Sequence, residues 1–275
     1  MTCKELGEQY ATVFNEYKEG KQEPGKENPF KSNDNKITEI LERGLYYCNN
    51  DTVLTDNILV LCGINPSGDG KNKGNIIDSY CPFKYAKDQG RSDYWKKKHN
   101  QFGGKDSDLV QNHIAYFDLL PLIESEQGLV EKVFKPYNSF RFQLVKITAK
   151  AIEDLKPKLI VHANKGSLYY WGLNPSSFTK DTKRPWLNYS FKEVTTNCPV
   201  LAKYIVRLNK YKEANTEQKL SKEYLHLFEM TGNGIKTRNY FMSYIMENPR
   251  FNDWQRVQLL SPEEMQGIWE WCCNQ

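Results

Sequence analysis

The chain has 275 residues, of which 39% are hydrophobic and 26% charged. This composition is typical of a globular protein, and the length is sufficient to bury a sizeable core. No apolar run approaches the roughly 20 residues of a membrane-spanning helix, and the polar N-terminus lacks a signal-peptide core. The seven cysteines form no CxxC pair, which favours reduced thiols over a zinc site. We therefore expect a cytoplasmic protein with no metal, no cofactor and no membrane partner.

The net charge of +4 has an uneven distribution along the chain. Residues 71–105 contain nine Lys or Arg and three Asp, a net charge of +6, so the remaining residues sum to −2. Aromatic residues are interleaved with these basic groups, which suits a phosphate backbone with stackable bases. The alternative is a solvated loop that is rich in lysine for solubility.

The apolar pattern predicts secondary structure in chain order. The expected strands are residues 57–62, 113–119, 158–163 and 199–208. The expected helices are residues 36–48, 139–155 and 164–172. Helical extensions are expected at residues 1–50 and 210–275, on either side of the strands.

Short apolar strands separated by helices predict a parallel sheet that is covered on both faces. We expect one α/β domain over residues 1–275, a three-layer α/β/α sandwich with a central, mostly parallel sheet of about four strands. Ligands of such sheets bind outside the carboxyl ends of the strands. Three loops at that edge carry candidate functional residues.

The first loop follows the first expected strand and reads "GINPSGDG", residues 63–70. Asn65 stands at the strand tip before Pro66, where a side-chain amide can orient a water molecule or bind a ligand. The glycines allow a ligand to approach the backbone. The alternative is a plain turn in which Asn65 caps its own backbone.

Two further loops follow the second and third expected strands. Asp118, in "DLLPL", is a carboxylate among apolar residues, which is costly unless it is paired or used. It either binds a ligand, caps a helix or pairs with a lysine. Asn164, Lys165 and Ser167 lie where a strand enters a helix, and free amides there can hold a phosphate. Helix capping by Asn164 is the alternative that this pattern favours.

These motifs, in this order, resemble the uracil-DNA glycosylase superfamily over residues 57–208. Its mismatch-specific branch has a Gly-Ile-Asn-Pro turn, matched here by Gly63, Ile64, Asn65 and Pro66. The resemblance implies that Asn65 positions the hydrolytic water and that its neighbours contact the base. It also implies that Phe83 stacks on the extruded base and that Asp118 reads the base edge.

The chain departs from the family pattern in two places. The family carries an asparagine where this chain has Asp118, so the base edge here would present donors. The family's last motif, a His-Pro-Ser-type loop, is missing after the fourth expected strand, and the similar "LNPSSF" at residues 173–178 comes too early.

The residues expected to contact DNA are Ser67, Lys84, Lys87, Arg91, Lys96, Lys97, Lys98, Asn164, Lys165 and Ser167.

The resemblance implies a DNA glycosylase-like hydrolase that removes a damaged or mismatched, uracil-like base by cleaving the N-glycosidic bond, with DNA as its partner. Two other functions stay open: a non-catalytic nucleic-acid or nucleotide-binding protein on the same fold, and a small-molecule enzyme that uses the same crevice. His113 and His162 are expected to be structural, and His99 to be solvated.

Overall fold

The computed structural model describes residues 1–48, 56–66, 77–80, 93–181, 186–217, 225–232, 239–244 and 251–275. The chain divides into two compact units, each assembled from segments that are far apart in the sequence. Unit 1 comprises Met1–Asp51, Cys62–Cys81 and Tyr116–Leu155. Unit 2 comprises Thr52–Leu61, Pro82–Ala115 and Lys156–Gln275.

The described strands are β1 (Leu45–Cys48), β2 (Leu59–Gly63), β3 (Ile77–Tyr80), β4 (Ile114–Asp118), β5 (Leu159–His162), β6 (Ser190–Glu193), β7 (His226–Thr231) and β8 (Asn239–Ser243). Six of them form one sheet in the order β4-β2-β5-β8-β7-β6, and β1 pairs with β3 in parallel. β8 runs parallel to β5, whereas β7 is antiparallel to both β8 and β6. Every residue of β2 and β5 is buried, as expected of strands covered on both faces.

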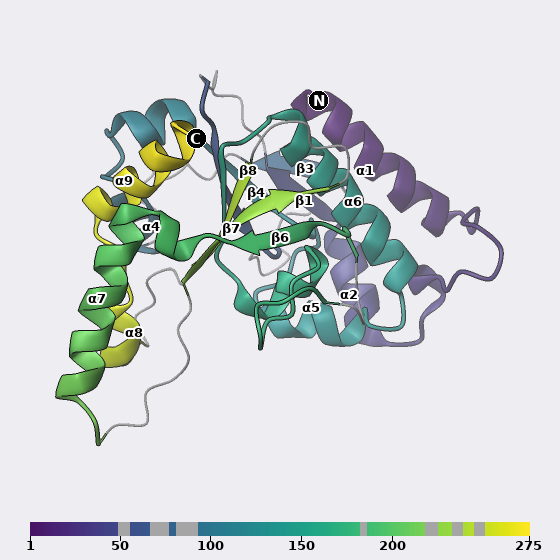
Figure 1. The fold of residues 1–275 in the computed structure, drawn as a ribbon. Coiled ribbons are helices and arrows are strands. Elements are labelled where there is room, and N and C mark those ends of the chain that lie inside the picture. The colour runs from purple at the N-terminus through teal and green to yellow at the C-terminus, as the bar shows by residue number, and fades with distance from the viewer. Residues whose placement is uncertain are drawn as a thin grey trace. The chain divides into compact units, whose positions relative to one another are not determined.

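The described α-helices are α1 (Cys3–Lys18), α2 (Asn35–Arg43), α4 (Asp93–Gln101), α5 (Gln127–Val133), α6 (Asn138–Asp154), α7 (Pro199–Ala214), α8 (Asp253–Val257) and α9 (Pro262–Cys273). In unit 1, α1 packs along α6, and Figure 1 shows the two helices side by side. Tyr10 of α1 hydrogen-bonds Thr148 of α6, whose hydroxyl in turn donates to the carbonyl of Leu119 at 2.9 Å. This chain of bonds fixes the backbone that follows β4.

The expected α/β class with a mostly parallel central sheet is confirmed, and the sheet has six strands rather than about four. The strands expected at residues 57–62, 113–119 and 158–163 correspond to β2, β4 and β5. The helix expected at residues 139–155 corresponds to α6.

The strand expected at residues 199–208 is wrong, because this segment belongs to α7. Pro199 occupies the first turn of the helix, where its missing N–H costs nothing and its fixed φ favours helical geometry. Leu201, Tyr204 and Leu208 are the buried residues, and they recur at helical spacing. The apolar run thus has a 3.6-residue period and marks a helix.

The extensions at residues 1–50 and 210–275 are not purely helical. The helix expected to run to residue 48 ends at Arg43, because Gly44 takes a left-handed φ of 78° and β1 follows it. In the C-terminal region, β7 and β8 pair as antiparallel strands and complete the sheet. Gly232, with φ of 116°, follows β7 directly.

Candidate functional site

The turn after β2 lies at the position where the winding of the sheet reverses. In chain order β2 is the first strand of the six, and its sheet neighbours, β4 and β5, lie on opposite sides of it. Ligands of open α/β sheets bind outside the carboxyl ends of the strands at such a switch point. Gly63 ends β2, so the turn at residues 63–66 occupies this position.

The backbone of this turn is bonded to the segment that follows β4. The carbonyl of Gly63 accepts from the N–H of Leu119 at 3.2 Å, and that of Ile64 from Leu120 at 2.7 Å. Further along, the carbonyl of Pro66 accepts from the N–H of Glu124 at 3.0 Å. Two segments about 55 residues apart in the sequence are therefore held in register.

Asn65 is buried, with 5% of its surface exposed, and its amide is held by the nitrogen. Nδ2 donates to the carbonyl of Glu124 at 2.7 Å and to that of Pro66 at 3.3 Å. Because both partners are acceptors, the atom that faces them must be the nitrogen and not the oxygen. No described residue donates a hydrogen bond to Oδ1, which is left as a buried acceptor for a water molecule or a ligand donor.

This arrangement differs from ordinary asparagine capping, in which the side-chain oxygen accepts from a nearby backbone N–H. Asn28, Asn174 and Asn252 all bond in that way, to the N–H of Phe30, Ser176 and Gln255 respectively. The bonds that Asn65 makes with described residues come from its nitrogen instead. The one bond to its own turn, to Pro66, is the longer of the two.

Asp118 lies at the end of β4 and is 5% exposed. The hydroxyl of Tyr116 donates to its Oδ1 at 2.8 Å, and both side chains lie directly against the backbone of Gly63. A Cβ at position 63 would come closer to both oxygens than real Cβ atoms approach any neighbour. The glycine is thus required by the close approach of Asp118 and Tyr116.

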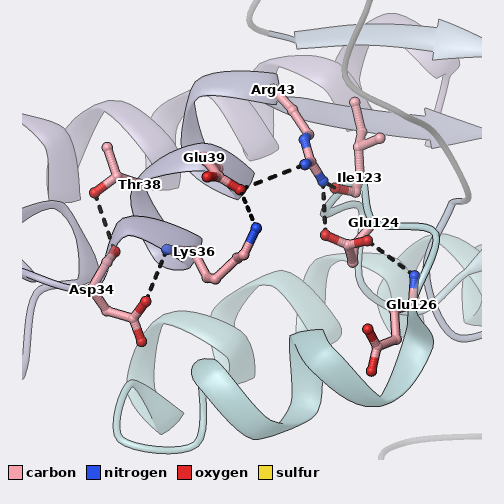
Figure 2. A network of polar contacts seen from close by, with 8 residues as sticks. All are labelled: Asp34, Lys36, Thr38, Glu39, Arg43, Ile123, Glu124 and Glu126. Carbon is pink, nitrogen blue, oxygen red and sulfur yellow. Dashed lines mark hydrogen bonds and ion pairs between the residues drawn. The ribbon is translucent and has the colours of Figure 1, made fainter.

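Glu124, which holds the Asn65 amide, is itself fixed by its side chain. Its Oε2 lies 2.7 Å from Nη1 of Arg43, and its Oε1 accepts from the N–H of Glu126 at 3.0 Å (Figure 2). Burial raises the pKa of the Glu124 carboxyl, but the Glu126 N–H and the Arg43 guanidinium together outweigh it, and the pKa lies below its usual value. The carboxylate is therefore ionised at neutral pH.

The third predicted loop belongs to unit 2. Asn164 precedes a six-residue 3-10 helix, η3 (Lys165–Tyr170), and its side chain makes no capping hydrogen bond to that helix. Ser167 is fully buried, and its hydroxyl donates to the Asn164 carbonyl at 3.0 Å and lies 2.9 Å from Nε2 of His162. The ammonium group of Lys165 lies 4.8 Å from the ring centroid of Phe178. A short helix and a buried serine do not favour a phosphate site here.

The histidines fit structural roles. Burial lowers the pKa of His162 to about 3, so the ring is neutral in the folded protein. His113 hydrogen-bonds the carbonyl of Asp56 at 2.9 Å and the Asp108 carboxylate at 3.2 Å. The expectation that His99 is solvated is wrong: it is 3% exposed, and burial lowers its pKa. His99 belongs to the last turn of α4 and is buried there.

The remaining residues predicted to contact DNA or the base fall into two groups. Lys96 is exposed, Lys97 is half-buried and Lys98 is 4% exposed, so Lys98 offers little surface to a phosphate. The other residues lie outside the described part of the chain: Ser67, Phe83, Lys84, Lys87 and Arg91. The predicted roles of these five stay predictions.

Of the predicted site residues, the structure brings together Gly63, Ile64, Asn65, Pro66 and Asp118 in unit 1. Sequence reasoning missed three residues that support them, namely Tyr116, Glu124 and Arg43. Tyr116 is detectable in principle, because residues two apart on a strand share a face. No local pattern connects Arg43 to Glu124, 81 residues away.

Comparisons with protein-family models, with curated proteins and with solved structures found no match. None of the helices in the described ranges is both long and apolar enough to span a bilayer. Within those same ranges, no group of three or more His, Cys, Asp or Glu side chains is arranged to hold a metal ion. The chemistry of the site therefore rests on the geometry of its own residues.

Proposed function

We propose that this protein is a DNA glycosylase-like hydrolase that removes a damaged or mismatched base by cleaving its N-glycosidic bond. The observation that supports this proposal is the Asn65 amide, which is buried, tethered by its nitrogen and without a described donor to Oδ1. An oxygen held in this way suits a hydrolytic water, which would donate a hydrogen bond to it. The turn also follows β2, at the switch point of the sheet.

The reaction requires the target nucleotide to leave the base stack, because the bond cannot be reached inside a duplex. Extrusion costs a few kcal/mol and is offset by contacts in the pocket. The stack on Phe83 would contribute roughly 1–3 kcal/mol, as measured for base–aromatic contacts on single strands. Asn65 is not a strong base, so the rate would come from positioning the water and stabilising the departing base.

Asp118 bears on which base is accepted. An ionised carboxylate accepts hydrogen bonds but cannot donate them, whereas an amide does both. Its Oδ1 already accepts from Tyr116, so the carboxylate is oriented by the strand that carries it. We therefore expect a base edge that presents an amino group to be preferred over uracil, whose single N–H lies between two carbonyl oxygens.

The test uses duplex and single-stranded oligonucleotides that carry uracil, hypoxanthine or a mismatched base, with abasic sites as the readout. We expect base release by the wild-type protein and a loss of at least about 100-fold in Asn65→Ala. Asn15→Ala, at an exposed asparagine of α1, is the matched control and should keep full activity. Base release that persists in Asn65→Ala would refute the assignment of the water to this residue.

Binding measurements separate the other functions. The basic residues between Lys84 and Lys97 predict DNA affinity that falls steeply as salt increases. Salt-dependent binding without any product would favour a non-catalytic nucleic-acid-binding protein. Absent or salt-insensitive binding would favour an enzyme that acts on a small molecule.

A further inference from the structure

Glu124 connects other parts of unit 1 to the turn that contains Asn65 and Pro66. Its carbonyl accepts from Nδ2 of Asn65 at 2.7 Å, and its N–H donates to the carbonyl of Pro66 at 3.0 Å. One residue therefore supplies both an acceptor and a donor to the turn. If the backbone at Glu124 moves or rotates, the direction of the Asn65 amide changes with it.

The backbone at Glu124 is held from outside its own segment by Arg43. Nη1 of Arg43 lies 2.7 Å from Oε2 of Glu124 and also donates to the carbonyl of Ile123 at 3.4 Å. The guanidinium thus hydrogen-bonds both the side chain of Glu124 and the carbonyl of the peptide that precedes it. Figure 2 shows Arg43 between the carboxylates of Glu39 and Glu124, at the end of α2. Both partners are largely buried, with side-chain exposures of 20% for Arg43 and 11% for Glu124.

A second tether joins the same two segments. The N–H of Tyr46, in β1, donates to the carbonyl of Pro121 at 2.8 Å, and Leu45 forms an antiparallel bridge with Leu122. Arg43 is separated from β1 only by Gly44, so helix, glycine and strand form one continuous support. Residues 43–46 therefore hold residues 121–124, which hold the turn.

From these contacts we infer that Arg43, acting through Glu124, is a positioning residue for the Asn65 amide. The N-terminal segment, which has no counterpart in the resemblance to the glycosylases, is then part of the working site and not an appendage. The catalytic consequence rests on the proposed function, but the orientation of the amide does not. An ion pair that only stabilised the fold would leave the Asn65 amide unchanged whenever the protein stays folded.

The experiment compares Arg43→Met and Glu124→Gln with the wild-type full chain. The first readout is the side-chain amide signal of Asn65 in a nitrogen–proton correlation spectrum, assigned by its loss in Asn65→Ala. We expect that signal to shift and its hydrogen exchange to accelerate in both variants. Lys150→Met is the matched control, because it removes an exposed ion pair, Lys150 with Asp154, of the same 2.7 Å separation in the same unit. It should leave the signal in place.

The second readout is base release. We expect kcat to fall by about 10- to 100-fold in Arg43→Met with KM little changed, since substrate contacts are not removed. In an Asn65→Ala background, Arg43→Met should cause no further loss, because the two residues act as one unit. An equal further loss in that background would overturn the inference.

Failure of the inference and failure of the proposed function give different results. An Asn65 signal that is unchanged in folded Arg43→Met and Glu124→Gln overturns the inference, whatever the activity. A wild-type protein that releases no base overturns the proposed function, and the amide signal still decides the inference. If Arg43→Met does not fold, Arg43→Lys takes its place: it keeps the charge but loses the fork that spans Glu124 and Ile123, so the amide signal should shift.

Discussion

Replacing Gly63 by alanine tests the geometry of the candidate site with a single methyl group. The new Cβ would lie closer than 3.0 Å to Oδ1 of Asp118 and to the hydroxyl of Tyr116, and 3.3 Å from Cζ of the same ring. Both side chains are buried and bonded to each other at 2.8 Å, so a movement of either one alone breaks that bond. Overpacking of this kind costs typically about 1–3 kcal/mol, and an intramolecular hydrogen bond contributes about 0.5–1.5 kcal/mol.

Because the two costs overlap, we expect Gly63→Ala to lower the free energy of unfolding by about 2–4 kcal/mol. Urea unfolding followed by tryptophan fluorescence measures this as a lower midpoint with an unchanged slope. Gly128→Ala is the control: it lies in α5, and nothing lies within 4 Å of its Cβ position, so it should stabilise by about 0.4–1 kcal/mol.

A second variant locates the cause of the loss. In the Gly63→Ala/Tyr116→Phe double variant, one of the two blocking oxygens is gone, and part of the lost stability should return. If Gly63→Ala is as stable as the wild-type protein, Asp118 and Tyr116 do not lie against the end of β2. The close packing of Gly63, Tyr116 and Asp118 would then be refuted.

Three further outcomes are expected. Burial lowers the pKa of His162 to about 3, so as the pH falls below 6.5 the unfolded chain binds a proton that the folded protein does not. The free energy of unfolding should therefore fall by up to about 1.4 kcal/mol per pH unit below 6.5. The urea midpoint of His162→Gln should lack this pH dependence. The pKa of Glu124 is lowered, so its contribution is present above the ordinary value of 4.5 and is lost as pH falls through the folded-state pKa; unfolding of Glu124→Gln should be less sensitive to pH in that range. Tyr10→Phe removes the bond to Thr148 and should cost about 1 kcal/mol in thermal unfolding, and an unchanged midpoint would show that this bond adds nothing.

The sequence predicted the strands that carry strong local signals. β2, β4 and β5 are short, fully buried apolar runs, and such runs are visible without knowledge of their partners. The apolar run of α7 resembles a strand in composition, although Pro199 at its start and the spacing of Leu201, Tyr204 and Leu208 favour a helix. The sequence did not predict β7 and β8, because the pattern of the region around them is mostly helical. Gly232, directly after β7, is the local signal for the end of a strand.

The candidate site was predictable only in the part that lies at strand ends. Asn65 follows β2 and Asp118 ends β4, so the rule for parallel sheets places them at the same edge. The direction of the Asn65 amide was not predictable, since it depends on a carbonyl 59 residues away. The pairing of Arg43 with Glu124 was also not predictable, because two residues 81 positions apart are not connected by any periodicity or spacing in the sequence.

The two ends of the Asn65 amide point to a preorganised site and not to a cap. A buried, unsatisfied acceptor costs about 1–3 kcal/mol, and a buried ion pair seldom stabilises a fold more than well-packed apolar residues do. In the described part of unit 1, Glu124 joins a buried acceptor that has no described donor, Oδ1 of Asn65, to a buried ion pair. This arrangement adds little to the stability of the fold, but it fixes one acceptor in a single direction. Catalysis by positioning needs such an acceptor, because the entropy of orienting the group is lost on folding and not when the substrate binds.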